Sequence, residues 1–197
     1  MSSNQIQNQA INSARSLRTL YFIRVIFSVI WVTLVALFAK SSPTIAGILV
    51  VIYPAWDVVG TIFDIRANRN NGPLTPQYIN LGISVITTIA VAASLSKGIP
   101  LVLIVFGIWA GLTGAIQLIL GLRRRHELGG QWPMILSGGQ SILAGVSFIV
   151  MSGSPTMGIV NLAGYSAFGA FYYLLSAIRL SKTINAGDGT LAKNNVK

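Results

Sequence analysis

The sequence has no cysteine, one histidine and four acidic residues among its 197. Without cysteine, the chain can form no disulfide or iron–sulfur cluster and can perform no thiol chemistry. Zinc and calcium sites need several His, Asp or Glu ligands, so little is left to build a metal site. No catalytic triad, phosphate-binding loop or nucleotide-binding fingerprint is present. We therefore expect no cofactor and no metal.

Charge is also scarce, at 9% of residues, whereas 53% are hydrophobic. A soluble domain carries about 25% charged residues. A chain of this length cannot hide so much apolar surface from water, because much of a small domain's area is exposed. The composition therefore predicts an integral membrane protein whose surroundings are the lipid bilayer.

What the sequence does contain is six long apolar segments, roughly at 20–39, 44–63, 78–97, 100–122, 133–152 and 157–178. Each is near the 20 or so residues needed to cross the hydrocarbon core. Each must be helical, because backbone groups find no water partner in lipid. We expect an all-α six-helix transmembrane domain at 18–182, after a polar segment at 1–17 that is mobile or interfacial. The tail at 183–197 is predicted to be disordered.

The basic residues predict the orientation of this bundle. Twelve of the 14 Lys and Arg residues flank one set of segment ends, and only Lys40 and Lys97 lie in the opposite connections. The positive-inside rule then places both chain ends in the cytoplasm. The net charge of +10 would also suit a nucleic-acid partner. Because the basic residues form short groups between apolar stretches, we expect no nucleic acid to bind.

An internal repeat divides the domain into three helical hairpins, at about 18–69, 78–125 and 132–182. One proline marks each short connection, at positions 43, 100 and 155. One arginine closes each hairpin, at positions 66, 123 and 179. Near-equal spacing of this kind indicates repeated structural units. Because proline suits the first turn of a helix, each short connection is predicted to be a tight turn.

The repeated glycines, turn prolines and closing arginines resemble the DUF308, or HdeD-like, family of bacterial inner-membrane proteins. The resemblance covers roughly 17–182, and its clearest carriers are GGQSILAGVSFIVMSGSPTMGIVNLAGYSAFGAFYYLLSAIRLSK and WAGLTGAIQLILGLRRR. The first hairpin departs from the pattern, with Asp57 where the second has Gly114 and the third Ala170. The resemblance implies a six-helix protein of the bacterial inner membrane, with one namesake linked to acid resistance. It implies no catalytic residues.

Asp57 is the one acidic residue inside a predicted span. Counting outward from the first connection puts Arg24 within about 3 Å of its depth, at 1.5 Å per residue. An unpaired charge at such a depth costs at least about 2.5 kcal/mol, so we predict an Arg24–Asp57 ion pair. Gln117 and Gln140 lie at similar depth in their segments. These four residues are the candidate intramembrane polar cluster, either as a cleft open to the cytoplasm or as interhelical hydrogen bonds without a substrate.

Small residues in the last three segments predict close helix packing. The candidate packing glycines are Gly107, Gly111, Gly139, Gly145, Gly164 and Gly169. A flexible hinge or a pore lining is the alternative interpretation of the same residues.

Three functional hypotheses follow from these patterns. The first is a non-enzymatic multi-pass membrane protein of the HdeD-like type, contributing to acid or envelope stress tolerance. The second is a small transporter or channel with a cytoplasm-facing polar cleft. A membrane-embedded enzyme is the third, and the scarcity of His, Asp and Glu argues against it. Expected partners besides lipid are a second copy of the chain, as a homo-oligomer, or another membrane protein.

Overall fold

A computed structural model describes residues 3–69, 73–128 and 131–194. Within these ranges the protein is all-α, as predicted, with six long helices. One turn of 3-10 helix, η1 (Leu95–Lys97), follows the third helix. The helices are α1 (Ser3–Phe38), α2 (Pro43–Ala67), α3 (Thr75–Ser94), α4 (Ile99–Leu128), α5 (Trp132–Val150) and α6 (Ile159–Asn194).

Five of these helices, α1 to α5, are long and apolar enough to cross a membrane. Their outer surface is apolar, and their interior holds buried polar side chains beside an apolar core. For example, Leu143 and Val150 are 70% and 77% exposed, whereas Ser84 and Ser166 are fully buried. The chain is therefore a multi-pass membrane protein. The sixth predicted segment lies in α6, which carries Asn161 and three tyrosines and is not among the five apolar spans.

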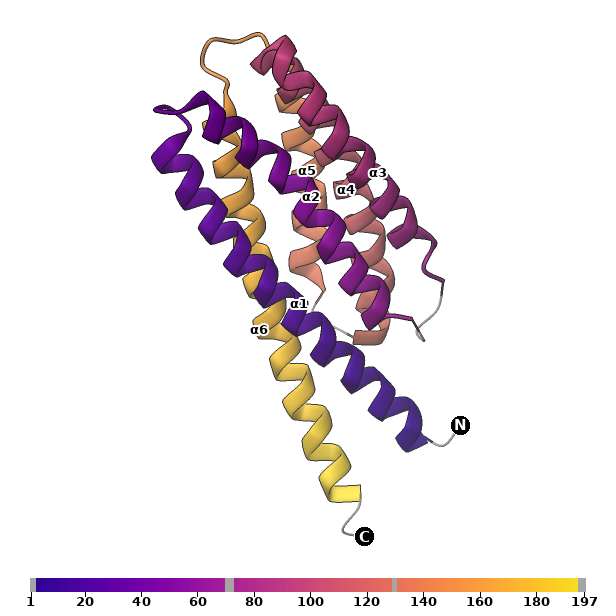
Figure 1. Ribbon diagram of the computed structural model, residues 1–197. Helices are drawn as coiled ribbons and strands as arrows, with labels where there is room; N and C mark the ends of the chain where they lie inside the picture. Colours follow the sequence, from indigo (N-terminus) through magenta and orange to yellow (C-terminus); the bar gives the residue numbers. More distant parts are fainter. Residues whose placement is uncertain (1–2, 70–72, 129–130, 195–197) are drawn as a thin grey trace.

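The helices lie side by side in one bundle (Figure 1), and their contacts close it into a ring. Each helix packs on its neighbours in the sequence, and α6 packs along α1 to complete the circle. The most extensive contacts join α4 to α5 and α1 to α6. Three short connections lie at one end of the bundle, which we call the turn end. The described chain ends, the last residues of α2 and α4 and the first residues of α3 and α5 lie at the opposite end, which we call the terminal end (Figure 1).

Two of the three short connections have the predicted proline in the first turn of the next helix. Pro43 begins α2, where Ser42 accepts a hydrogen bond from the Ile45 backbone N–H at 3.3 Å as the N-cap. Pro100 is the second residue of α4, and it follows Gly98, whose φ of 101° favours glycine. The third prediction was wrong: Pro155 lies four residues before α6, in a longer connection at 151–158.

The two ends of the chain also differ from the sequence prediction. The segment expected to be mobile or interfacial is helical from Ser3 onward, and the tail expected to be disordered continues α6 to Asn194. Apolar residues at helical spacing explain the difference, because they give the two helices a shared seam at the terminal end. The buried residues of this seam include Ile11, Ala14 and Leu17 on α1, and Ala177, Leu180 and Ile184 on α6.

Glycines bring α4 and α5 into backbone contact. A Cβ placed on Gly107 would lie 2.6 Å from the Gly145 carbonyl oxygen, and one on Gly145 would meet the backbones of Gly107 and Gly111. Gly114 and Gly138 meet in the same way, with each virtual Cβ within 2.8 Å of the other's carbonyl oxygen. No larger residue fits this seam, which is how small residues act between membrane helices.

Four of the six predicted glycines leave room for a side chain. A Cβ on Gly111, Gly139, Gly164 or Gly169 would meet no atom within 4 Å, although the Gly111 backbone lies close to Gly145. The physical reason is the register of the helix: Gly138 and Gly145 are seven residues apart and share one face of α5. Gly139 lies about 100° around the helix from that face.

The turn end of the interior is dry and aromatic. Phe106 is fully buried at the centre of this cluster, with its ring 5.0 Å from that of Trp109 and 6.2 Å from that of Phe148. Trp31 is 2% exposed and donates its indole N–H to the Leu49 carbonyl oxygen at 2.7 Å. Close packing of rings around these residues closes the bundle from that side.

Candidate functional site

A cavity of about 110 Å³ lies inside the ring, between the aromatic cluster and the terminal end. All six helices contribute to its wall. The wall is rich in hydroxyl, amide and charged side chains, which are costly at membrane depth and therefore mark functional sites in membrane proteins. The polar residues of the wall include Arg24, Ser28, Tyr53, Asp57, Thr61, Asp64, Gln77, Asn80, Thr113, Gln117, Arg124, Ser137, Ser141, Tyr165 and Tyr173.

The structure places Arg24 and Asp57 in contact, the pairing that the sequence suggested. The Arg24 Nη1 atom lies 2.8 Å from Asp57 Oδ1, and the two side chains are 15% and 13% exposed. The same Nη1 donates to the Tyr173 hydroxyl at 3.1 Å, so α1, α2 and α6 are joined at one point. Gly60 makes room for the guanidinium, because a Cβ there would lie 2.6 Å from Arg24 Nη2.

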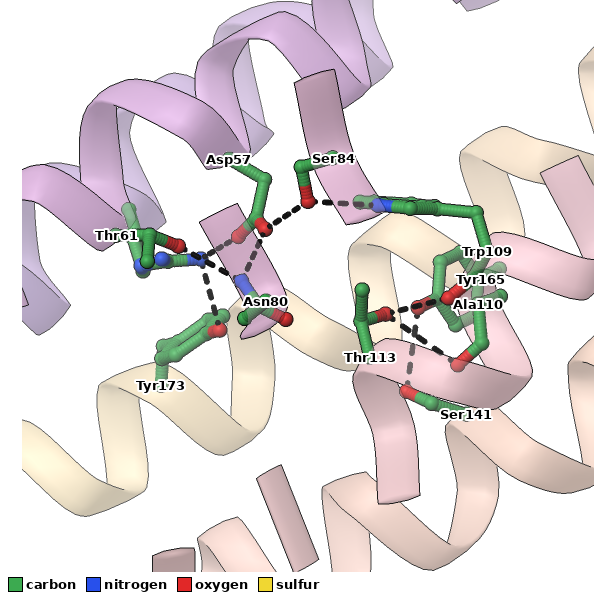
Figure 2. Close-up of polar contacts among 11 residues, drawn as sticks. Asp57, Thr61, Asn80, Ser84, Trp109, Ala110, Thr113, Ser141, Tyr165 and Tyr173 are labelled. Atoms are coloured by element: carbon green, nitrogen blue, oxygen red, sulfur yellow. Dashed lines mark hydrogen bonds and ion pairs between the residues drawn. The ribbon is translucent and has the colours of Figure 1, made fainter. Parts of the chain in front are cut away.

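A chain of hydrogen bonds extends from the other oxygen of Asp57 (Figure 2). Oδ2 accepts from Asn80 Nδ2 and from Ser84 Oγ, both at 2.8 Å. Ser84 in turn accepts the indole N–H of Trp109 at 3.0 Å, and Asn80 also donates to Thr61 at 2.8 Å. The carboxylate is thus held by donors from α1 and α3, and these donors are held in turn by Trp109 on α4 and Thr61 on α2.

A second ion pair, absent from the sequence prediction, lies two helical turns away on the same face of α2. Arg124 Nη2 donates to both oxygens of Asp64, at 2.8 and 2.9 Å. Asn68 adds a bond from Nδ2 to Asp64 Oδ1 at 2.8 Å. Asp57 and Asp64 are seven residues apart, or about 10 Å along the helix. The two pairs are therefore stacked along the cavity, with Asp64 nearer the terminal end.

The predicted spans ended at 63 and 122, which left both Asp64 and Arg124 outside the apolar spans, although inside the predicted domain at 18–182. In the structure α2 continues to Ala67 and α4 to Leu128, so both side chains point inward from helix ends and are 12% exposed. The i, i+7 spacing of the two aspartates is the signal that could have found the second pair, because it puts both on one helix face.

Only one of the two glutamines of the predicted cluster lines the cavity. Gln117 is in the cavity wall and donates from Nε2 to the Met134 carbonyl oxygen at 3.3 Å. Gln140 is half-buried on α5 and is not one of the residues that line the cavity. The face of α5 that lines the cavity carries Ser137 and Ser141, and Gln140 lies one residue off this face. Depth alone did not predict which way the side chain points.

The site offers binding groups rather than an obvious catalytic centre. Among the described residues there is no group of three or more His, Cys, Asp or Glu side chains that could hold a metal ion. His126 is exposed at the end of α4, outside the cavity wall. What the arrangement can do is bind a small polar molecule between fixed charges and aromatic rings.

No family model matches the chain, and neither the curated proteins nor the solved structures give a significant match.

Proposed function

We propose that the chain is a non-enzymatic membrane transporter for a small polar solute, and that the cavity is the solute's binding site. One observation carries this proposal: two Arg–Asp pairs and a polar wall surround a cavity inside helices that are apolar enough to span a membrane. Desolvating four charges is expensive, and well-packed apolar residues would hold six helices together at least as well. A polar interior is explained if a polar molecule has to enter it.

Transport requires that the cavity open to each side of the membrane in turn. In this structure one end of the bundle is suited to be open and the other to be closed. The cavity reaches toward the terminal end through the Arg124–Asp64 pair, whereas the rings around Phe106 close the turn end. A state open to the turn end requires these rings to separate. We propose that the structure represents the state whose cavity faces the terminal side, with the aromatic cluster as the closed barrier.

The proposed architecture is a ring of three hairpin repeats that includes α6 as a sixth span. Burial supports it, because positions offset by 57 and then 56 residues are buried alike. Leu49, Phe106 and Leu162 on the second helix of each hairpin are 5%, 0% and 0% exposed. Ala46, Leu103 and Ile159, three residues earlier, are 2%, 0% and 7% exposed. In each hairpin, the second helix thus presents the same register to the interior, which is the pattern of parallel repeats.

The basic residues support the orientation of this ring, with both chain ends in the cytoplasm. We propose that the membrane is a bacterial inner membrane and that the cavity faces its cytoplasmic side. A role in acid or envelope stress, which the HdeD-like resemblance implies, stays a prediction. So do a homo-oligomer and a membrane protein partner.

Solute entry into proteoliposomes tests the proposed function. Purified protein is reconstituted, and swelling in a gradient of glycerol, alanine or sodium acetate is followed by stopped-flow light scattering. A pH-sensitive dye inside the vesicles reports protons in parallel. We expect at least one solute to enter faster than into protein-free vesicles. Asp57→Asn should reduce that rate at least about tenfold, because it removes the charge that holds Arg24 in the cavity wall.

Lys97→Gln is the matched control, because Lys97 is exposed at the turn end and lies outside the cavity wall. This variant also removes one charge, and it should transport like the wild type. If the wild type admits none of these solutes or protons faster than protein-free vesicles, the transport proposal is wrong.

A further inference from the structure

Each of the two buried carboxylates in the cavity wall accepts three hydrogen bonds. Asp57 accepts one bond on Oδ1 and two on Oδ2, all at 2.8 Å. Asp64 accepts from Arg124 and Asn68 on Oδ1 and from Arg124 on Oδ2. A carboxylate has about four acceptor positions. Neither aspartate therefore has a strong need for a further donor from a ligand.

Arg24, in contrast to the two aspartates, has hydrogen-bond donors without a partner among the described residues. A guanidinium has five N–H donors, and the two bonds that Arg24 makes both come from Nη1. Its Nε and Nη2, with three donors, have no hydrogen-bond partner among the described residues, although Arg24 lines the cavity and is only 15% exposed. The Trp56 indole N–H, on another part of the wall, is fully buried without a partner in the described chain, and a buried donor of this kind requires an acceptor. Arg24 lines the cavity, so its unpaired donors are available to a bound molecule.

Gly60 lets the guanidinium of Arg24 lie directly against the backbone of α2. A Cβ on Gly60 would lie 2.6 Å from Nη2, 2.9 Å from Cζ and 3.1 Å from Nε. Any larger residue at position 60 would displace the guanidinium from its present place. The pairing of Arg24 with Asp57 therefore depends on a residue without a side chain directly beside the unused donors.

We propose that Arg24 binds the carboxylate of an anionic ligand through Nε and Nη2. These two atoms present parallel N–H bonds along one edge of the guanidinium, the geometry that holds a carboxylate with two hydrogen bonds. The lining charges Arg24, Asp57, Arg124 and Asp64 cancel, so one added negative charge finds two guanidinium groups nearby. The chain's net charge of +10 also attracts anions toward the membrane surface. Binding of the carboxylate does not depend on the proposed function; only the further step, that this ligand is the transported solute, rests on it.

The carboxylate can arrive by two routes. One is the aqueous route from the terminal end. The other is a second cavity of about 270 Å³ between α1 and α6, whose wall is almost wholly apolar and includes Val29 and Phe171, each more than half exposed. Ser28 lines both cavities and is one helical turn from Arg24. A soluble short-chain acid would use the first route, and a fatty acid with its chain in the apolar groove would use the second.

Equilibrium binding to the full chain in lipid nanodiscs tests the inference, with radiolabelled butyrate for the first route and radiolabelled palmitate for the second. We expect one of them to bind and the uncharged butyramide not to compete. Arg24→Lys keeps a cation beside Asp57 but removes the two-bond edge, so it should weaken binding at least tenfold. Gly60→Ala should weaken it similarly by displacing the guanidinium.

Gly82→Ala is the matched control, because Gly82 is also a helical glycine and a Cβ there meets no atom within 4 Å. Its binding should equal that of the wild type. Circular dichroism shows whether each variant folds, and Arg24→Lys remains informative if Gly60→Ala does not.

Absence of binding by both acids, or unchanged binding by folded Arg24→Lys, overturns the inference. Solute flux without carboxylate binding would overturn this inference alone. Carboxylate binding without any flux would overturn the transport proposal and leave the binding site in place.

Discussion

The terminal half and the turn half of the bundle are built from the same helices, yet different interactions hold the helices together in each half. At the terminal half, charged and amide groups from four helices hold one another around a cavity. At the turn half, buried aromatic rings and close helix contacts occupy the interior. The terminal half combines an apolar seam with a few directional bonds, each costly to lose, whereas the turn half depends on many weak contacts. The difference indicates that only the terminal half is built to admit a polar molecule.

The largest expected effect is on the ion pair of the terminal half. Asp57→Asn leaves Arg24 charged and partly buried without its counter-ion, so we expect a loss of about 3–5 kcal/mol in the free energy of unfolding. Unfolding in mixed micelles by SDS titration, followed by circular dichroism, measures it. Adding Arg24→Gln should restore part of the loss, because the double variant leaves no unpaired charge at this point of the wall. Strictly additive losses would show that the two side chains do not interact.

A smaller loss is expected at the glycine seam of the turn half. Gly145→Ala places a methyl group against the backbones of Gly107 and Gly111, and overpacking of this kind costs about 1–3 kcal/mol. Gly139→Ala, six residues earlier on α5, is the control. It meets no atom within 4 Å and should be neutral or slightly stabilising, since alanine favours a helix. Equal losses in the same SDS titration would show that α4 and α5 do not approach as described.

The smallest expected effect concerns a single hydrogen bond within the aromatic cluster. Trp31→Phe removes the bond to the Leu49 carbonyl oxygen but keeps an aromatic ring, so we expect a loss of about 1 kcal/mol in the free energy of unfolding. Solute flux should stay unchanged, because Trp31 is not in the cavity wall. A loss of flux without loss of stability would show that the aromatic cluster takes part in the solute path.

Sequence reasoning reached part of this site and missed part of it, for identifiable reasons. Arg24 and Asp57 were matched by depth. This works because two helices that leave a shared turn run nearly antiparallel, so equal numbers of residues from the turn reach equal depth in the membrane. Asp64 and Arg124 were missed because apolar segments end before helices do. Gln140 was grouped with the cluster because depth says nothing about rotation around the helix axis.

The sequence by itself determined that this chain is a bundle of membrane helices, because composition, segment length and backbone hydrogen bonding leave no other solution in lipid. Only the tertiary structure decided which side chains meet. The closure of the ring by α6 on α1, the stacking of two ion pairs on one face of α2 and the unpaired donors of Arg24 beside Gly60 all depend on helix rotation and extension. These are set by packing among all six helices at once, which no local stretch of sequence specifies.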